Sequence, residues 1–172
     1  NAILDRTDAI MLSGESANGD WPVESVQTMA RIATETEEQL KYETAVSKAK
    51  SHTPAISGVI SRAACNAANE LKAAAIVSST KSGATARRIS QCRPECPIVA
   101  VTPSEKVAKS LAFCFGVYPV VAEDQNSTDA MMANATKIAV ENGFANSGDT
   151  VVIAAGLDQV GSTNLLKVSV VE

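Results

Sequence analysis

The sequence has few aromatic residues, no excess of basic charge and no long apolar run. Aromatic side chains make up 3% of its 172 residues, and the formal net charge is −4. So few aromatics cannot build a base-stacking surface, and an acidic chain offers no electrostatic footprint for nucleic acid. The longest apolar runs, such as residues 117–122, fall far short of the roughly 20 residues that a membrane-spanning helix needs. We therefore expect neither a nucleic-acid partner nor a membrane.

Cysteine and histidine are also scarce. The chain has four cysteines, at positions 65, 92, 96 and 114, and a single histidine, His52. The cysteine spacing forms no disulfide framework in a chain of this length, which is typical of a reducing compartment. Cys92 and Cys96 could form half of a metal site, but no second pair completes it, so free core thiols are the better interpretation. With no signal-peptide pattern at the N-terminus, we expect a cytoplasmic protein.

From residue 55 onward, apolar segments alternate with helical patterns. The spacing predicts helices over residues 56–71, 83–91, 104–113 and 128–142, and strands over residues 74–78, 98–101, 117–121, 150–154 and 165–171. Strands separated by helices favour right-handed crossovers and a mostly parallel sheet covered on both faces. The short connection before the last strand favours an antiparallel hairpin. The predicted fold class is α/β, with a mixed five-stranded sheet.

The N-terminal segment predicts a strand, a polar loop and a helix. Residues 9–12 are apolar, and a helix is expected from Pro22 through residue 34, with Asp20 as its capping acceptor. In a closed parallel α/β barrel, polar residues just beyond a strand lie at the reaction face, which would make Ser13 and Glu15 catalytic candidates. The alternative is a polar loop that only caps a helix.

The segment from Thr7 to Glu24 resembles the last β/α unit of the pyruvate kinase barrel. That family has a pattern close to Thr-Asp-Ala-(Val/Ile)-Met-Leu-Ser-Gly-Glu-Thr-Ala-x-Gly-x-(Tyr/Trp)-Pro-x-Glu, from which this sequence departs at Ser16. Arg6, just ahead of it, replaces the usual glycine. The resemblance implies one β/α unit of an incomplete TIM barrel over residues 1–44, a linker over 45–54 and a second domain over 55–172. Ser13 and Glu15 would be active-site remnants that are not competent alone.

A polar loop between a predicted strand and helix is the strongest candidate binding site. It contains Ser79, Thr80, Lys81, Ser82, Gly83 and Thr85. A helix start leaves backbone N–H groups unpaired and carries partial positive charge, so a phosphate could bind there, helped by the hydroxyls and Lys81 while Gly83 lets the backbone approach closely. The alternative is that the hydroxyls only cap the helix. A second candidate wall is the turn over residues 156–164, including Gly161, Ser162 and Thr163.

The same region is similar to the C-terminal domain of pyruvate kinases. The resemblance rests on Thr80 to Gly83, on Arg93-Pro94 followed by residues 97–102, and on Gly161 to Asn164. It implies an allosteric site in which residues 80–85 hold a phosphate and residues 156–164 close over the ligand. Members of the family bind fructose 1,6-bisphosphate, or AMP and sugar monophosphates. Met131 and Ala84 stand where some relatives have arginine, which favours a monophosphate.

The resemblance also implies a function for the parent protein. A pyruvate kinase transfers a phosphoryl group from phosphoenolpyruvate to ADP in glycolysis, uses Mg²⁺ and usually K⁺, and forms a homotetramer. For this chain we expect a regulatory part with no metal or cofactor of its own, no activity alone, and the rest of the barrel and further copies of itself as partners. The alternatives are an oligomerisation module without an effector site and, less favoured, a free-standing phosphotransferase that uses Ser13.

Overall fold

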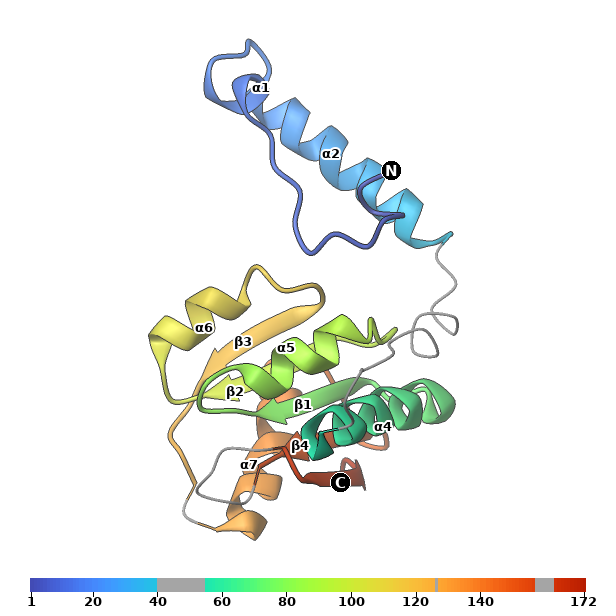
Figure 1. The fold of residues 1–172 in the computed structure, drawn as a ribbon, viewed down its shortest axis with the longest axis vertical. Coiled ribbons are helices and arrows are strands. Elements are labelled where there is room, and N and C mark those ends of the chain that lie inside the picture. Colours follow the sequence, from blue (N-terminus) through green and yellow to red (C-terminus); the bar gives the residue numbers. More distant parts are fainter. Residues whose placement is uncertain (40–54, 126, 157–162) are drawn as a thin grey trace. The chain divides into compact units, whose positions relative to one another are not determined.

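The chain folds into two compact units, Asn1–Lys41 and Tyr42–Glu172. The computed structural model describes residues 1–39, 55–125, 127–156 and 163–172 (Figure 1). None of the helices in these ranges is long and apolar enough to cross a membrane.

The first unit contains α1 (Gly14–Ala17) and α2 (Pro22–Glu37). Pro22 occupies the first turn of α2, where its fixed φ and missing N–H cost nothing. The prediction that Asp20 caps this helix is wrong, because Trp21 holds the cap position and no side chain caps it. Asp20 lies one residue too early for its carboxylate to serve as the N-cap acceptor.

The predicted strand over residues 9–12 is also wrong. These residues have no regular secondary structure, and the Met11 side chain is 87% exposed. A buried parallel strand needs hydrogen bonds from neighbouring strands, and the described part of this unit holds no other strand. Val23, Val26 and Ile32 on α2 are exposed for the same reason, because no sheet of this unit covers them.

The second unit follows the predicted order of helices and strands, with each boundary within two residues of its prediction. Its elements are α4 (Ile56–Leu71), β1 (Ala75–Ser79), α5 (Ala84–Gln91), β2 (Ile98–Thr102), α6 (Glu105–Leu111), β3 (Val117–Val121), α7 (Thr128–Glu141), β4 (Thr150–Ala155) and β5 (Leu165–Val170). The sheet order is β3-β2-β1-β4-β5. Strands β1 to β4 run parallel to one another, and β5 is antiparallel to β4, so the mixed sheet and the hairpin are confirmed.

Two apolar layers pack against the sheet, one on each face. On one face, Ile76 of β1 packs in a cluster with side chains of α4, α5 and α6, such as Ile89 and Leu111. On the other face, Val77 packs with side chains of α7, such as Ile138. The side chains of adjacent strand residues thus pack in opposite layers, because successive side chains of a strand point to opposite faces of the sheet. The predicted cover of helices on both faces is confirmed (Figure 1).

The direction in which successive strands are added to the sheet reverses next to β1. The chain moves outward from β1 to β2 and β3, then returns through α7 to place β4 on the other side of β1. Connections leaving the carboxyl ends of β1 and β4 therefore diverge, and open α/β sheets bind their ligands at such a point.

Candidate anion-binding site

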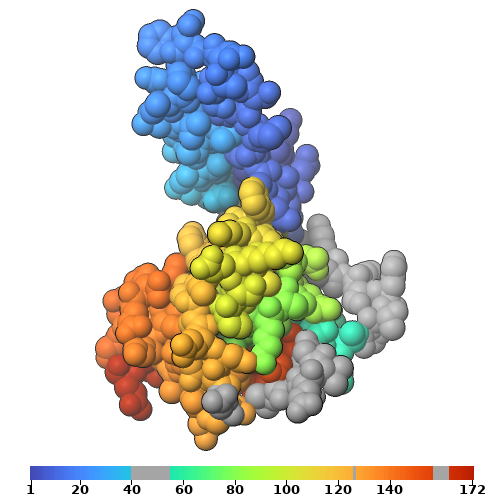
Figure 2. Space-filling view, turned by 90° about the vertical axis from the view of Figure 1, so that its left-hand side faces the viewer, coloured from blue at the N-terminus to red at the C-terminus, as the bar shows by residue number. Residues whose placement is uncertain are grey.

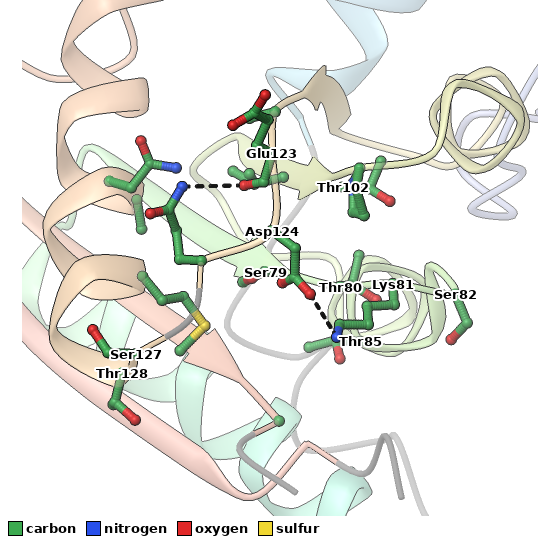
Figure 3. Close-up of a pocket in the computed structure, with 18 residues that line it drawn as sticks. Ser79, Thr80, Lys81, Ser82, Thr85, Thr102, Glu123, Asp124, Ser127 and Thr128 are labelled. Carbon is green, nitrogen blue, oxygen red and sulfur yellow. Dashed lines mark hydrogen bonds and ion pairs between the residues drawn. The ribbon is translucent and has the colours of Figure 1, made fainter. Parts of the chain in front are cut away.

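A cavity of about 340 Å³ lies at the carboxyl ends of β1 to β4 (Figure 3). Its walls come from the connections that follow these strands and from the first turns of α7. The lining residues are 79–82 and 85, 101–103, 122–125, 127, 128, 131, 134, 135 and 156. The segment between β3 and α7, light orange in Figure 2, lies at the surface of the unit. Four connections distant in sequence thus form one polar hollow.

Five of the six predicted phosphate-binding residues line this cavity. These are Ser79, Thr80, Lys81, Ser82 and Thr85. Helix α5 begins after Gly83 with no side chain capping it, and the described residues provide no acceptor for the N–H groups of Ala84 and Thr85. The Thr80 hydroxyl instead accepts a 3.0 Å hydrogen bond from the Gly83 N–H, which closes the turn ahead of the helix. The turn thus uses the Thr80 hydroxyl without capping the helix, and the start of α5 keeps two donors for an anion.

Gly83 is the sixth predicted residue, and it does not line the cavity. Its φ is +81°, and a Cβ there would lie 2.7 Å from Arg87 Nη1 and 3.2 Å from side-chain atoms of Val107 and Leu111. The missing side chain therefore makes room for α6 and Arg87. The predicted reason, close approach of the backbone to a ligand, is replaced by a requirement of turn geometry and helix packing.

Arg87 holds the β1–α5 connection against α6. Its Nη1 donates to the Ser82 carbonyl at 3.0 Å, and its Nη2 donates to the Ser110 hydroxyl at 2.8 Å. The guanidinium is thus engaged outside the cavity, and of the lining residues that the structure describes only Lys81 is a cation.

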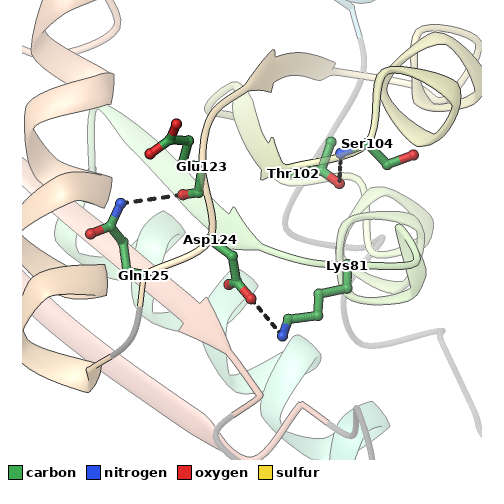
Figure 4. Close-up of polar contacts among 6 residues, drawn as sticks. All are labelled: Lys81, Thr102, Ser104, Glu123, Asp124 and Gln125. Atoms are coloured by element: carbon green, nitrogen blue, oxygen red, sulfur yellow. Dashed lines mark hydrogen bonds and ion pairs between the residues drawn. The ribbon is translucent and has the colours of Figure 1, made fainter.

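Lys81 makes an ion pair across the cavity. Its Nζ lies 2.6 Å from Asp124 Oδ2, as Figures 3 and 4 show. Next to Asp124, the Gln125 side chain turns back and donates to the Glu123 carbonyl at 3.2 Å. Sequence reasoning missed these three residues. The signal was present, because they directly follow β3 and so share the sheet edge at which β1 ends.

Thr163 was predicted to be part of a loop that closes over the ligand. Its hydroxyl lies 2.6 Å from the hydroxyl of Thr85, and both side chains are buried. Thr163 therefore contacts the candidate site through Thr85 and does not itself line the cavity. Gly161 and Ser162 lie outside the described residues.

In the first unit, Ser13 and Glu15 lie together at the start of α1. The Glu15 carboxylate accepts a 3.1 Å hydrogen bond from the Ser13 N–H. Hydrogen bonds from the backbone N–H groups of Glu15 and Ser13 hold the pKa of this exposed carboxyl below its ordinary value of 4.5. The Glu15 carboxylate thus accepts from the residue directly ahead of α1. Among the residues that the structure describes, no group of three or more His, Cys, Asp or Glu side chains could hold a metal ion.

Comparison with known proteins identifies the family. A family model described as the pyruvate kinase alpha/beta domain matches residues 58–169. The chain belongs to the pyruvate kinase family. It is 49% identical to the pyruvate kinase of Clostridium acetobutylicum, with 100% of this chain and 37% of that protein covered. It is 44% identical to the pyruvate kinase of Bacillus licheniformis, with 99% and 30% covered.

Solved pyruvate kinase structures share the fold. A crystal structure of a pyruvate kinase from Cryptosporidium parvum matches with a TM-score of 0.90 at 31% identity and covers 100% of this chain and 35% of that one. A second pyruvate kinase structure from that species gives 0.86 at 30% identity, covering 100% and 34%. The chain spans about a third of the length of the pyruvate kinases it matches. The expected C-terminal fragment of a pyruvate kinase is thereby confirmed.

Proposed function

We propose that the second unit is a regulatory domain that binds a phosphorylated small molecule at the 340 Å³ cavity. The observation that carries this proposal is the start of α5, where the N–H groups of Ala84 and Thr85 have no acceptor among the described residues. Thr85, Lys81 and the hydroxyl-bearing Thr80 and Ser82 line the same cavity. These groups suit a phosphate, which accepts several hydrogen bonds and carries negative charge.

The charge of the cavity favours a ligand with one phosphate. Among the described residues, its lining holds one cation, Lys81, and two carboxylates, Glu123 and Asp124. A second phosphate would meet no cation there and would be repelled by the carboxylates. Uncharged hydroxyl groups could instead donate to those carboxylates and to Asn134. A nucleoside monophosphate such as AMP, or a sugar monophosphate, is the ligand class that fits.

Calorimetric titration of the 172-residue chain with AMP, ribose 5-phosphate and fructose 1,6-bisphosphate tests this proposal. We expect at least one monophosphate to bind, and the Lys81→Ala variant to bind it at least about tenfold more weakly, because a charge-assisted contact is lost. Ser110→Ala is the matched control, since it changes the contact of Arg87 outside the cavity. Absence of heat with all three ligands would contradict an effector site.

The activity of the whole protein is a second part of the proposal. As a pyruvate kinase, the complete enzyme would transfer the phosphoryl group of phosphoenolpyruvate to ADP, and Ser13 and Glu15 would lie at its catalytic face. Mg²⁺ and K⁺ would act in the complete enzyme, and the proposed effector site uses neither. Phosphoryl transfer requires positioned cations and donors around the moving group, so we expect this chain alone to be inactive. A coupled pyruvate-forming assay that shows turnover would contradict this.

Subunit association is the second candidate function, and β5 favours it. This strand lies at the edge of the sheet, and Val168 and Val170 on it are 42% and 60% exposed. An exposed edge strand with apolar side chains is a surface on which another chain can pair. Sedimentation of the chain without ligand tests this candidate, and a monomer at all concentrations would contradict it.

The four cysteines are free thiols, and we infer a cytoplasmic location from them.

A further inference from the structure

The ion pair between Lys81 and Asp124 joins two connections that do not follow neighbouring strands. Lys81 lies in the connection after β1 and Asp124 in the connection after β3, while β2 lies between these strands in the sheet. The Nζ to Oδ2 distance is 2.6 Å, and the two side chains are 77% and 49% exposed. Figure 4 shows the two side chains meeting between these connections, and both residues line the cavity.

We propose that Asp124 is an internal competitor of the ligand phosphate. Its carboxylate pairs with Lys81 when the cavity is empty and is displaced when a phosphate binds. This inference rests on the proposed effector site and assigns to it a residue that sets its affinity.

A carboxylate and a phosphate both suit an ammonium group, so Lys81 must exchange one for the other. The exchange favours the phosphate for two reasons. A phosphate carries more charge than a carboxylate at pH 7, and it could also accept from the N–H groups of Ala84 and Thr85. In the structure, within the described residues, no hydrogen bond joins the Asp124 carboxylate to these N–H groups. An ion pair that is largely exposed is weak, so displacement costs little.

Displacement would also release one connection from another. Asp124 belongs to the segment between β3 and α7, and the ion pair ties this segment to the β1–α5 connection. Once Lys81 holds a phosphate, the position of Asp124 is set by its contacts with the ligand and no longer by Lys81. Only a ligand with different affinity for the two arrangements can shift their populations, and this exchange supplies such a difference.

The test compares Asp124→Asn with Glu123→Gln in calorimetric titrations of the 172-residue chain with ribose 5-phosphate. Both variants remove one negative charge from the cavity lining, but only the first removes the partner of Lys81. We expect Asp124→Asn to bind about two- to fivefold more tightly than the original chain, and Glu123→Gln to differ by less than about twofold. In a Lys81→Ala background, Asp124→Asn should add less than about twofold.

The outcomes separate this inference from the proposed function. If the original chain binds ribose 5-phosphate but Asp124→Asn binds it equally well or more weakly, Asp124 is no competitor and the effector site remains. Equal gains in both variants would reduce the effect to general electrostatics and overturn the inference. If no variant binds ribose 5-phosphate, this inference fails, and the effector site fails with it only if AMP does not bind the original chain either. As a second readout, a crystal structure with ribose 5-phosphate should show Lys81 and Asp124 more than about 4 Å apart, and an intact ion pair would overturn the inference.

Discussion

The hydroxyl groups of Thr85 and Thr163 share a buried hydrogen bond of 2.6 Å across 78 positions of sequence. Thr85 lies in the first turn of α5, and Thr163 lies two residues ahead of β5. One hydroxyl donates to the other, and both side chains are at most 5% exposed. The candidate phosphate loop is therefore fastened to the C-terminal hairpin of the same unit.

Replacing Thr163 with Val should destabilise the second unit by about 1–2 kcal/mol, because the Thr85 hydroxyl is left buried without its partner. The double variant Thr85→Val with Thr163→Val should cost less than the sum of the two single changes. Urea unfolding followed by far-UV circular dichroism measures this. Tryptophan fluorescence would not, because the single tryptophan, Trp21, lies in the first unit. Strict additivity of the single changes would show that the hydroxyls do not interact.

Gly83→Ala and Gly58→Ala should have opposite effects on stability. At Gly83 the φ of +81° and the close Arg87 side chain make a methyl group unfavourable, by about 1–2 kcal/mol. At Gly58 on α4, a Cβ would meet only an Arg62 side-chain atom at 3.6 Å, so alanine should stabilise the helix by about 0.5–1 kcal/mol. The same unfolding experiment measures both. A stabilised Gly83→Ala variant would contradict the turn geometry described here.

The carboxyl of Glu15 should titrate below its ordinary pKa of 4.5 in the folded chain, because backbone N–H groups of Glu15 and Ser13 bond to its charged form. A lowered folded pKa means that the stabilisation is complete above the unfolded value and is lost as the pH falls through the folded value. Carbon-13 NMR titration with and without urea measures the two midpoints. Equal midpoints would show that the bond to Ser13 does not persist in solution.

Cys96 should react slowly with iodoacetamide in the folded chain. Burial raises the pKa of its thiol from 9.0 to about 11, so the thiolate fraction at pH 8 falls about 100-fold. The pKa of Cys65 is also raised, because its thiol interacts with that of Cys92 and is buried. Mass spectrometry of labelled peptides, with the urea-unfolded chain as the control, measures each rate. Equal rates for Cys96 in both states would contradict this burial.

The sequence alone predicted the second unit well, because its apolar spacing is satisfied inside the unit. The strand over Ala75–Ser79 and the helix over Ala84–Gln91 have their neighbours within the same sheet and layers. The strand expected over residues 9–12 could not form, since local apolarity does not supply the neighbouring strands that it needs.

The candidate site was predicted in part for a similar reason. Lys81 and its neighbouring hydroxyls follow one strand and are visible as a single run of sequence. Asp124 lies 43 positions later, and its pairing with Lys81 depends on the order of strands in the sheet, which only the structure shows. The side chains of α6 that lie against Gly83, Val107 and Leu111, are also distant from it in sequence.

If the opening amides of α5 hold a phosphate group, their NMR shifts must change when a phosphorylated ligand binds. Ribose 5-phosphate and, separately, AMP are titrated into the nitrogen-15-labelled 172-residue chain. Our account predicts the largest shifts at Ser82, Ala84 and Thr85, with smaller ones at Asp124 and Gln125. The structure has another cavity, lined by Asn69 and Cys96 among others. Saturating shifts confined to that cavity, or no shifts at all, would contradict phosphate binding at α5.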